Sequence, residues 1–192
     1  RHGTMEAYVA AKCRIFSAQQ SGDVAVLNGD DTAVATLTLP VGVRKLEFSR
    51  SHTVPDGLWA DGDIIRAGSD AVASCDDVPL PGQHNIDNAL AALTMARAAN
   101  FNWEHCIEGL RNFNGVPHRI EFVLSAHDVD YYNDSKSTNI DSLRVALQSF
   151  DRPIILIAGG RGKGDSYQAL SPLIKAHVKS LIAFGEDAEN LD

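Results

Sequence analysis

Cysteine is scarce in this sequence, and its few copies are scattered. Only Cys13, Cys75 and Cys106 occur among the 192 residues, and no two of them form a CxxC pair. An odd number of widely separated cysteines favours neither a disulfide framework nor a zinc site. We therefore expect reduced thiols and a cytoplasmic protein.

Long apolar runs and an excess of positive charge are also missing. No stretch is long and apolar enough to cross a bilayer, and no signal peptide is visible. The 17 Lys and Arg residues are outnumbered by 25 Asp and Glu residues, which gives a formal net charge of -8. Nucleic acids and anionic membranes require a basic face, so we expect neither as a partner. A local cationic pocket for a small anion remains compatible with this charge balance.

The overall composition is that of an ordinary globular protein. Hydrophobic residues make up 44% of the chain and charged residues 22%. A chain of 192 residues can form one large or two small domains. Because the first residue is Arg1 rather than Met, we expect a piece of a longer protein.

Residues 1–115 mix helices with short strands. Apolar residues at helical spacing follow Thr4, and Ala- and Leu-rich helical stretches come later. Between residues 33 and 80, short β-like runs alternate with Gly, Asp and Ser, which predicts antiparallel strands. The predicted elements are a helix from Thr4, strands near 24–28, 43–48, 58–60 and 64–65, and helices over 85–99 and 103–112.

The pattern changes after Asn114-Gly115-Val116-Pro117, which is typical of a turn. From there strands and helices alternate, which predicts parallel βαβ units. We therefore predict an α/β protein with two domains, residues 1–115 and 116–192. In the second domain, Asp134 and Gly160 are expected at carboxyl ends of strands of one parallel sheet, where their loops should open on the same crevice. The predicted elements there are strands near 120–125, 129–132, 154–158 and 181–184, and helices over 140–150 and 167–177.

Lys12 is an unusual residue for its position. It lies near the centre of the predicted apolar stripe of the first helix, with Tyr8 and Ile15 on either side. One interpretation is a lysine whose stem packs while its ammonium reaches water. The other is a buried functional lysine, whose amine can capture carbon dioxide and become a carbamate that binds a metal. The pattern leaves both interpretations open.

Two amides begin the helix predicted from residue 85. Asn85 and Asn88 are three residues apart, so they share one side of the helix, away from Leu90 and Leu93. Asn85 can serve simply as the N-cap, with Asn88 a solvated residue of the first turn. Alternatively, the two amides can hydrogen-bond the edge of a purine.

Two polar segments follow in the second domain. In Pro117-His118-Arg119, the guanidinium can hold a phosphate or pair with Glu121. Residues 133–139 join a strand end to a helix start, where open α/β sheets bind ligands. Their carboxylate, lysine and hydroxyls lie next to a helix N-terminus, which favours anions. Helix capping by Thr138 or Asn139 explains only part of this cluster.

A glycine-rich loop, residues 159–164, follows a strand and precedes a helix. Glycines let backbone amides approach an anion closely, and Arg161 and Lys163 add positive charge. The loop is not a Walker A motif, because Lys163 is followed by Gly164 rather than Ser or Thr, and it does not fit GxGxxG. A pocket for a carboxylate or phosphate and a plain tight turn both remain open.

The order of these segments along nearly the whole chain resembles the Mur ligase family. Residues 133–139, Asn-Asp-Ser-Lys-Ser-Thr-Asn, most resemble the D-glutamate-adding branch, where Ala is common at the position of Ser137. Sister ligases and folylpolyglutamate synthases carry different segments there. The matching segments are Tyr8-Val9-Ala10-Ala11-Lys12, Leu27-Asn28-Gly29-Asp30-Asp31, residues 82–88, Pro117-His118-Arg119, residues 133–139 and the Gly-Gly-x-x-Lys loop.

The resemblance implies an ATP-dependent ligase of cell-wall (peptidoglycan) synthesis. Residues 1–115 would be the back half of a central ATPase domain, and residues 116–192 the front part of a Rossmann-like domain that brings the amino acid. The implied reaction activates UDP-N-acetylmuramoyl-L-alanine with ATP to an acyl phosphate, which the amine of D-glutamate then attacks. The Walker A loop would precede Arg1, so the chain alone should be inactive; we expect a monomer.

The resemblance also implies roles for individual residues. Lys12 would be carbamylated and ligate Mg²⁺, and Lys136 would take part in catalysis. Thr138 and Lys163 would hold the D-glutamate carboxylates. A sister ligase, a folylpolyglutamate synthase-like enzyme and a non-catalytic nucleotide- or amino-acid-binding module are the alternatives. The residues expected around ATP are Asn85, Asn88, His118, Arg119, Asp134 and Lys136.

Overall fold

The computed structural model describes residues 3–161, 166–186 and 188–191, and its chain divides into two compact units. Unit 1 comprises Arg1–Pro79 and Asn85–Phe113, and unit 2 comprises Leu80–His84 and Asn114–Asp192. A short segment before Asn85 thus belongs with the second half of the chain. The α/β class predicted from the sequence is confirmed, whereas the boundary at residues 115 and 116 stays a prediction about domains.

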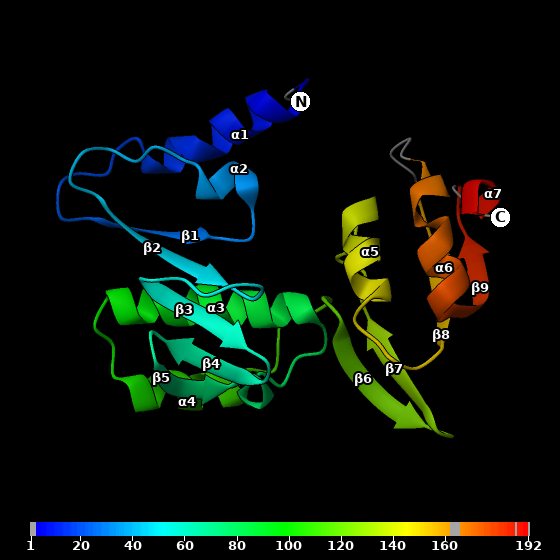
Figure 1. Cartoon of the computed structure of the whole chain (residues 1–192). Helices are drawn as coiled ribbons and strands as arrows, with labels where there is room; N and C mark the ends of the chain where they lie inside the picture. Colours follow the sequence, from blue (N-terminus) through cyan, green and yellow to red (C-terminus); the bar gives the residue numbers. More distant parts are fainter. Residues whose placement is uncertain (1–2, 162–165, 187, 192) are drawn as a thin grey trace. The chain divides into compact units, whose positions relative to one another are not determined.

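Unit 1 is built on a five-stranded sheet with the order β1-β2-β3-β4-β5. Strands β1, β2 and β3 pair in parallel, and β3, β4 and β5 pair antiparallel. The elements are α1 (Met5–Cys13), η1 (Arg14–Phe16), β1 (Val24–Asn28), α2 (Thr32–Ala35), β2 (Arg44–Ser49), β3 (Gly57–Asp61), β4 (Ile64–Ala67), β5 (Asp70–Ser74), η2 (Cys75–Asp77), α3 (Gln83–Ala98) and α4 (Trp103–Arg111) (Figure 1).

The prediction of antiparallel strands between residues 33 and 80 is wrong for β2. This strand pairs in parallel with both neighbours, with Val26 opposite Leu46 and Phe48 opposite Leu58. An alternating pattern of side chains reports which face each residue takes but not the direction of the neighbouring strand. The direction depends on the connection, and residues 29–43, which include α2, return the chain to the starting end of the sheet.

Helices α3 and α4 contribute to the core of unit 1. Leu58 and Ile65 of the sheet and Leu90 of α3 are fully buried in one cluster, which Leu93 and Ile107 join. Burying a side chain of this size stabilises the fold by about 1.5–3 kcal/mol. The face of α3 that carries Leu90 and Leu93 is therefore fixed against the sheet.

Helix α1 begins where the sequence predicts. Thr4 is its N-cap, and the Thr4 hydroxyl accepts a hydrogen bond from the Ala7 amide at 3.2 Å. However, no residue of α1 is buried, and Met5 is 70% exposed. The apolar stripe predicted from its spacing therefore lies at the surface of the described chain.

Unit 2 contains two separate pairs of strands. Strands β6 and β7 form an antiparallel hairpin. Strands β8 and β9 pair in parallel, and the chain between them forms η3 and α6. The predicted βαβ arrangement is confirmed for β8 and β9. The elements are β6 (Glu121–Ala126), β7 (Val129–Asn133), α5 (Ile140–Leu147), β8 (Ile154–Gly159), η3 (Tyr167–Leu170), α6 (Ser171–His177), β9 (Val178–Phe184) and α7 (Ala188–Leu191).

The prediction of a single parallel sheet is wrong for the β6–β7 hairpin. His127 and Asp128 form its two-residue turn, and both have positive φ, 51° and 61°. Positive φ at both central residues is typical of a type I′ turn, whose twist matches a two-stranded hairpin. The usual Asn-Gly or Asp-Gly signal is absent from the sequence here, so the turn escaped prediction.

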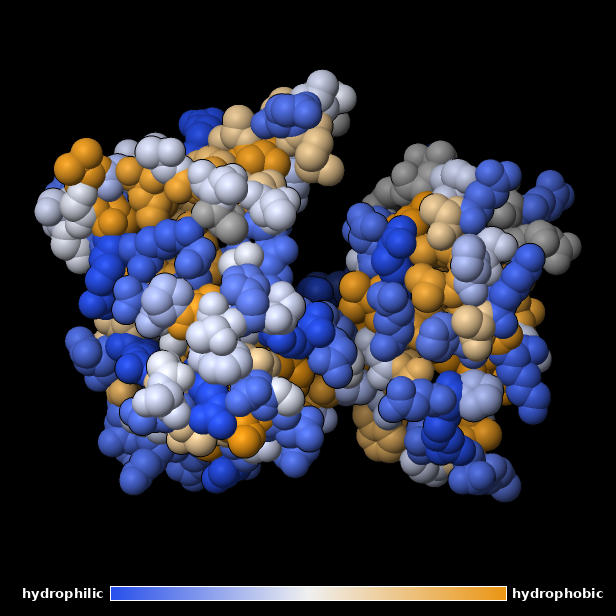
Figure 2. All heavy atoms as spheres, viewed as in Figure 1, coloured by the Kyte–Doolittle hydropathy of each residue, from blue (hydrophilic) through white to orange (hydrophobic). Residues whose placement is uncertain are grey.

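Apolar side chains reach the visible surface of both units (Figure 2). On the β8–β9 pair, Ile155, Ile157, Ile182 and Phe184 are each at least half exposed.

No helix in the described ranges combines the length and apolar character that crossing a bilayer requires.

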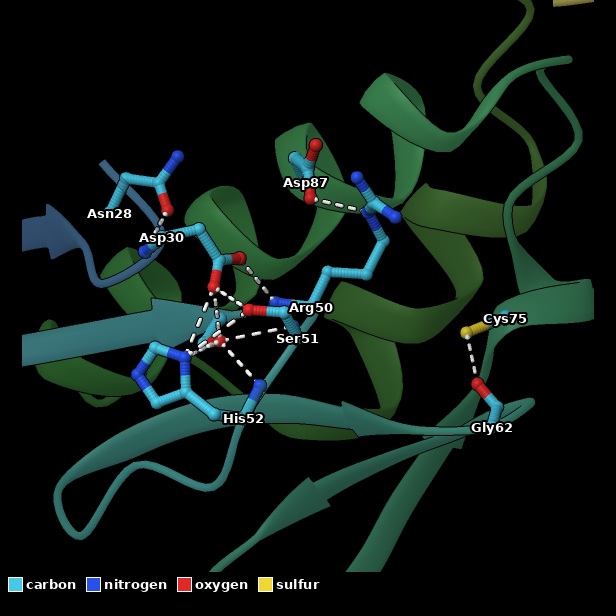
Figure 3. A network of polar contacts seen from close by, with 9 residues as sticks. Asn28, Asp30, Arg50, Ser51, His52, Gly62, Cys75 and Asp87 are labelled. Carbon is cyan, nitrogen blue, oxygen red and sulfur yellow. Dashed lines mark hydrogen bonds and ion pairs between the residues drawn. The ribbon is translucent and has the colours of Figure 1, made fainter. Parts of the chain in front are cut away.

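The carboxylate of Asp30 joins the carboxyl ends of β1 and β2 (Figure 3). Its Oδ1 accepts a hydrogen bond from Ser49 Oγ at 2.7 Å, and its Oδ2 accepts one from the Arg50 amide at 2.8 Å. The Ser51 hydroxyl also donates to Oδ1, and His52 Nδ1 lies 3.2 Å from the same oxygen. We call these five residues the Asp30 cluster. Burial raises the pKa of Asp30, but the donors and the imidazole outweigh burial and lower it from 3.8 to about 2.

The lowered pKa makes a prediction about acid stability. Because the folded pKa of Asp30 lies below its ordinary value, the carboxylate stabilises the fold above about pH 4, and this contribution is lost as the pH falls towards 2. Because Asp30 is partly exposed and solvent screens its interactions, we expect Asp30→Asn to lower the free energy of unfolding at pH 7 by about 1 kcal/mol. In urea titrations, the difference in free energy of unfolding between Asp30→Asn and the parent chain should shrink as the pH falls from 4 to 2.

Asp31→Asn is the matched control, because Asp31 caps α2 through the Ala33 amide and Asn caps equally well. An Asp30→Asn variant as stable at pH 7 as Asp31→Asn would contradict the stabilising role of the Asp30 carboxylate.

Candidate functional site

Two segments that the sequence singled out are joined in unit 2. The Lys136 amide donates to the His118 carbonyl at 2.9 Å, and the Ile120 amide donates to Asp134 Oδ1 at 3.1 Å. Asn133 Nδ2 lies 2.8 Å from His118 Nδ1. The structure therefore brings together His118, Asp134 and Lys136, three of the residues predicted around the nucleotide.

The backbone at this junction adopts an unusual conformation. His118 and Ile120 have φ values of 67° and 44°. Positive φ is rare for a β-branched residue and costs about 1–3 kcal/mol, so neighbouring contacts must hold it. Asp134 is one such contact, since it binds the Ile120 amide and also accepts a hydrogen bond from Ser137 Oγ at 2.5 Å. Strain of this kind tends to cluster at ligand sites.

Glu121 contacts His118 rather than Arg119 in this junction. Of the two alternatives for Arg119, a phosphate contact or a pair with Glu121, the structure does not form the second: Glu121 Oε2 accepts a hydrogen bond from the His118 amide at 2.7 Å. Within the described ranges no ion pair joins Arg119 to Glu121. The spacing of three residues from His118 to Glu121, either side of a tight turn, is the signal that could have revealed the contact.

Polar side chains line the exposed rim of this junction. Arg119, Lys136 and Thr138 are all exposed. Of the two predicted capping residues, Asn139 is the N-cap of α5 and accepts the Ser142 amide at 2.8 Å. Thr138 is therefore not needed as the cap, and its role at the D-glutamate stays a prediction.

The glycine-rich loop owes part of its composition to strand pairing. Gly159 has φ of 150°, and a Cβ there would lie 1.9 Å from the Phe184 carbonyl oxygen. The Gly160 amide donates to the same oxygen at 3.0 Å. Arg161 is exposed, and its Nε lies 3.7 Å from Glu186 Oε2. Lys163 lies outside the described residues, so its predicted contact with D-glutamate stays a prediction.

Asp134 and Gly160 each follow the carboxyl end of a strand, as predicted. Asp134 comes directly after β7, and Gly160 comes directly after β8. The expectation that both strands belong to one parallel sheet is wrong, because β7 pairs with β6 and β8 with β9. A common ligand crevice for the two loops stays a prediction.

The two amides of α3 lie in unit 1. Helix α3 begins at Gln83, so Asn85 lies inside the first turn rather than at the N-cap. Asn88 Nδ2 lies 3.3 Å from Asn85 Oδ1, which confirms that the two side chains share one side of the helix. Asn85 is half-buried and Asn88 is exposed, while Leu90 faces the core. The residues predicted around ATP are thus divided between the two units.

Lys12 is not buried. It is exposed on α1, and its Nζ lies 5.4 Å from the centre of the Tyr8 ring. Of the two interpretations of Lys12, the buried amine does not hold, because no residue of α1 is buried. The alternative, an ammonium that reaches water, agrees with the exposure of Lys12. A role as metal ligand stays a prediction. No group of three or more His, Cys, Asp or Glu residues suited to a metal ion occurs in the part of the chain that the structure describes.

Comparison with known proteins decides the family. Residues 1–96 match the Mur ligase middle domain, and residues 118–192 match the Mur ligase glutamate ligase domain. The chain belongs to the Mur ligase family. The two matched regions account for most of the chain and leave residues 97–117 between them.

Relatives along the whole chain are D-glutamate ligases. The chain is 42% identical over 98% of its length to UDP-N-acetylmuramoylalanine–D-glutamate ligase of Pelotomaculum thermopropionicum, and 44% identical over its full length to the ligase of the same name from Clostridioides difficile. It spans 42% and 43% of those proteins. The fold is similar to MurF from Acinetobacter baumannii, with a TM-score of 0.74, 21% identity, and coverage of 98% of this chain and 44% of that one.

The contact between Gly159 and Phe184 generates a prediction for this Mur ligase chain. Gly159→Ala would place a methyl group against the Phe184 carbonyl, so β8 and β9 must separate or distort. We expect a loss of about 2–4 kcal/mol in the free energy of unfolding of unit 2, measured by urea denaturation.

Gly160→Ala is the matched control. Its φ of 110° is strained, but a Cβ there meets nothing within 4 Å, so we expect a smaller loss of about 1–2 kcal/mol. Equal losses in the two variants would contradict the steric argument for Gly159.

Proposed function

We propose that this chain forms part of an ATP-dependent ligase that adds D-glutamate to UDP-N-acetylmuramoyl-L-alanine in the cytoplasm. The observation that carries the proposal is identity of 42–44% with D-glutamate ligases along 98% or more of the chain, through both units. The chain spans less than half of those relatives, so the activity is proposed for the native protein that carries these residues.

The proposed reaction proceeds in two steps. The substrate carboxylate attacks the γ-phosphorus of ATP, which gives an acyl phosphate and ADP. The deprotonated amine of D-glutamate then attacks the acyl carbon, which forms the amide and releases phosphate. Phosphoryl transfer of this kind depends mainly on positioning and on cationic groups around the transferred phosphate.

The junction in unit 2 suits the nucleotide and phosphates. His118 and Asp134 are held in place by hydrogen bonds to their own neighbours, and Lys136 is anchored by its amide while its side chain is exposed. An anchored backbone with an exposed ammonium can follow the charge that develops on a phosphoryl group. Asn85 and Asn88 would hydrogen-bond the adenine, and Arg119 would contact a phosphate.

Thr138 and Lys163 are proposed to bind the D-glutamate carboxylates. Thr138 is exposed and immediately precedes Asn139, the N-cap of α5. It therefore lies near a helix N-terminus, which favours anions.

Lys12 fits a role beside Mg²⁺ only as a carbamate. Mg²⁺ prefers oxygen ligands and commonly binds through one or two carboxylates together with substrate phosphates. The exposed amine of Lys12 is accessible to carbon dioxide, and its carbamate would offer such oxygens. The bound ion would supply positive charge next to the transferred phosphate.

The proposed activity can be measured directly. The native protein, UDP-N-acetylmuramoyl-L-alanine and ATP should release ADP in a manner that depends on D-glutamate, with the amide product detected by mass spectrometry. Preference for another amino acid would indicate a sister ligase. Binding of ATP without any turnover would favour a non-catalytic module.

A first variant addresses the amino-acid site. Lys163→Ala should raise the KM for D-glutamate at least tenfold, because losing a hydrogen bond to a charged group costs about 1.5–3 kcal/mol. The KM for ATP should stay unchanged. Lys179→Ala, which removes an exposed lysine of β9, is the control and should alter neither constant. An unchanged KM for D-glutamate in Lys163→Ala would remove Lys163 from the site.

A second variant addresses the carbamate. Lys12→Met keeps the apolar stem and helix propensity but removes the amine, so turnover should be lost. The contact between Lys12 and the exposed Tyr8 ring is worth about 0.5–1 kcal/mol, so the fold should survive. In Lys12→Ala, acetate or a similar small acid should restore part of the activity. Full turnover by Lys12→Met would contradict the metal-ligand role.

A further inference from the structure

Arg50 extends the Asp30 cluster to helix α3. Its amide is held by Asp30, and its Nε lies 2.9 Å from Asp87 Oδ1 (Figure 3). Asp87 lies near the start of α3, between the two amides proposed to bind adenine. Since Asn88 Nδ2 lies 3.3 Å from Asn85 Oδ1, the amides belong to the same turn. A series of contacts thus runs from the carboxyl ends of β1 and β2 to this turn.

The contact between Arg50 and Asp87 is unsuited to a purely stabilising role. Their side chains are 40% and 29% exposed, and solvent screens ion pairs of this kind, so such pairs add little to stability. Leu90 and Leu93 already fix the middle of α3 against the sheet. The ion pair links the loop that follows β2 to the first turns of α3.

The first turns of α3 are also where the chain passes between units. Leu80–His84 belong to unit 2, whereas the chain from Asn85 onward belongs to unit 1. Helix α3 begins at Gln83, so both amides lie in its first turns. A hydrogen bond weakens steeply when its donor and acceptor are misaligned, so the orientation of these amides matters to the affinity for a bound ligand.

We propose that Arg50 and Asp87 are positioning residues for the nucleotide. The Asp30 cluster fixes the backbone of Arg50, the guanidinium fixes Asp87, and the turn that carries Asn85 and Asn88 is oriented as a result. This inference rests on the proposed function, because it requires these amides to contact the adenine.

The test uses Arg50→Gln, Asp87→Asn and the double variant in the native protein. Each single change should raise the KM for ATP and the Kd for ADP about two- to fivefold, because an exposed ion pair is weak and its loss only partly frees the amides from their orientation. The kcat at saturating ATP should stay within about twofold of the parent value. The double variant should bind no more weakly than either single variant, since both changes break the same contact.

Two further variants separate positioning from stability. Arg66→Gln breaks an ion pair of similar geometry in the same unit, Arg66 Nε to Asp61 Oδ2 at 2.7 Å, and should leave the Kd for ADP unchanged. Arg50→Lys keeps a cation and should recover part of the affinity. A merely structural role would lower the Tm of Arg50→Gln and Arg66→Gln alike, with no selective loss of nucleotide binding, and would overturn the proposal.

Asn85→Ala distinguishes failure of this proposal from failure of the nucleotide site. If Asn85→Ala weakens ADP binding while Arg50→Gln and Asp87→Asn do not, the positioning role is wrong and the nucleotide site stands. If Asn85→Ala binds ADP as tightly as the parent protein, the adenine assignment fails and the positioning role with it. Because Kd for ADP does not depend on turnover, both results are independent of the ligase assay.

Discussion

Parallel pairing of β1 with β2 brings their carboxyl ends to one edge of the sheet, and the carboxylate of Asp30 holds them there. Ser49 is fully buried, and its hydroxyl donates to this carboxylate. The backbone amide of the next residue, Arg50, donates to the other carboxylate oxygen. A buried hydroxyl needs such a partner, because an unsatisfied polar group costs about 1–3 kcal/mol. The edge that results is the place where open α/β sheets present ligand-binding loops.

In unit 2, too, carboxylates hold polar loops in place by accepting hydrogen bonds from backbone amides. Asp134 binds the amide of Ile120, whose positive φ would otherwise be unfavourable, and Glu121 binds the amide of His118. In both units a carboxylate accepts backbone amides and thereby fixes the conformation of a loop. The residues left exposed by these arrangements, such as Lys136 and Thr138, are those that the proposed reaction requires at the ligand.

Much of the local structure could be predicted from the sequence. The apolar periodicity of residues 24–28 and 154–158 matches β1 and β8, and the Thr4 cap matches the start of α1. These features depend on neighbours within a few residues. The arrangement of the site was harder to predict from the sequence, since contacts such as that of the Lys136 amide with the His118 carbonyl join residues far apart in the chain. The motifs pointed to the candidate residues, whereas the contact of Glu121 with His118 and the contacts within the Asp30 cluster depend on the tertiary structure.

The sequence by itself determined the α/β class, the approximate positions of most helices and strands, and the resemblance to the Mur ligase family, because periodicity, capping and motif order are local or linear properties. It did not predict α2, β5 or α7. Only the tertiary structure decided the direction of β2, the hairpin at His127 and Asp128, and the exposure of Lys12. Strand direction depends on where a connection ends, and burial depends on what packs against a helix. Neither quantity is encoded by the spacing of residues within one element.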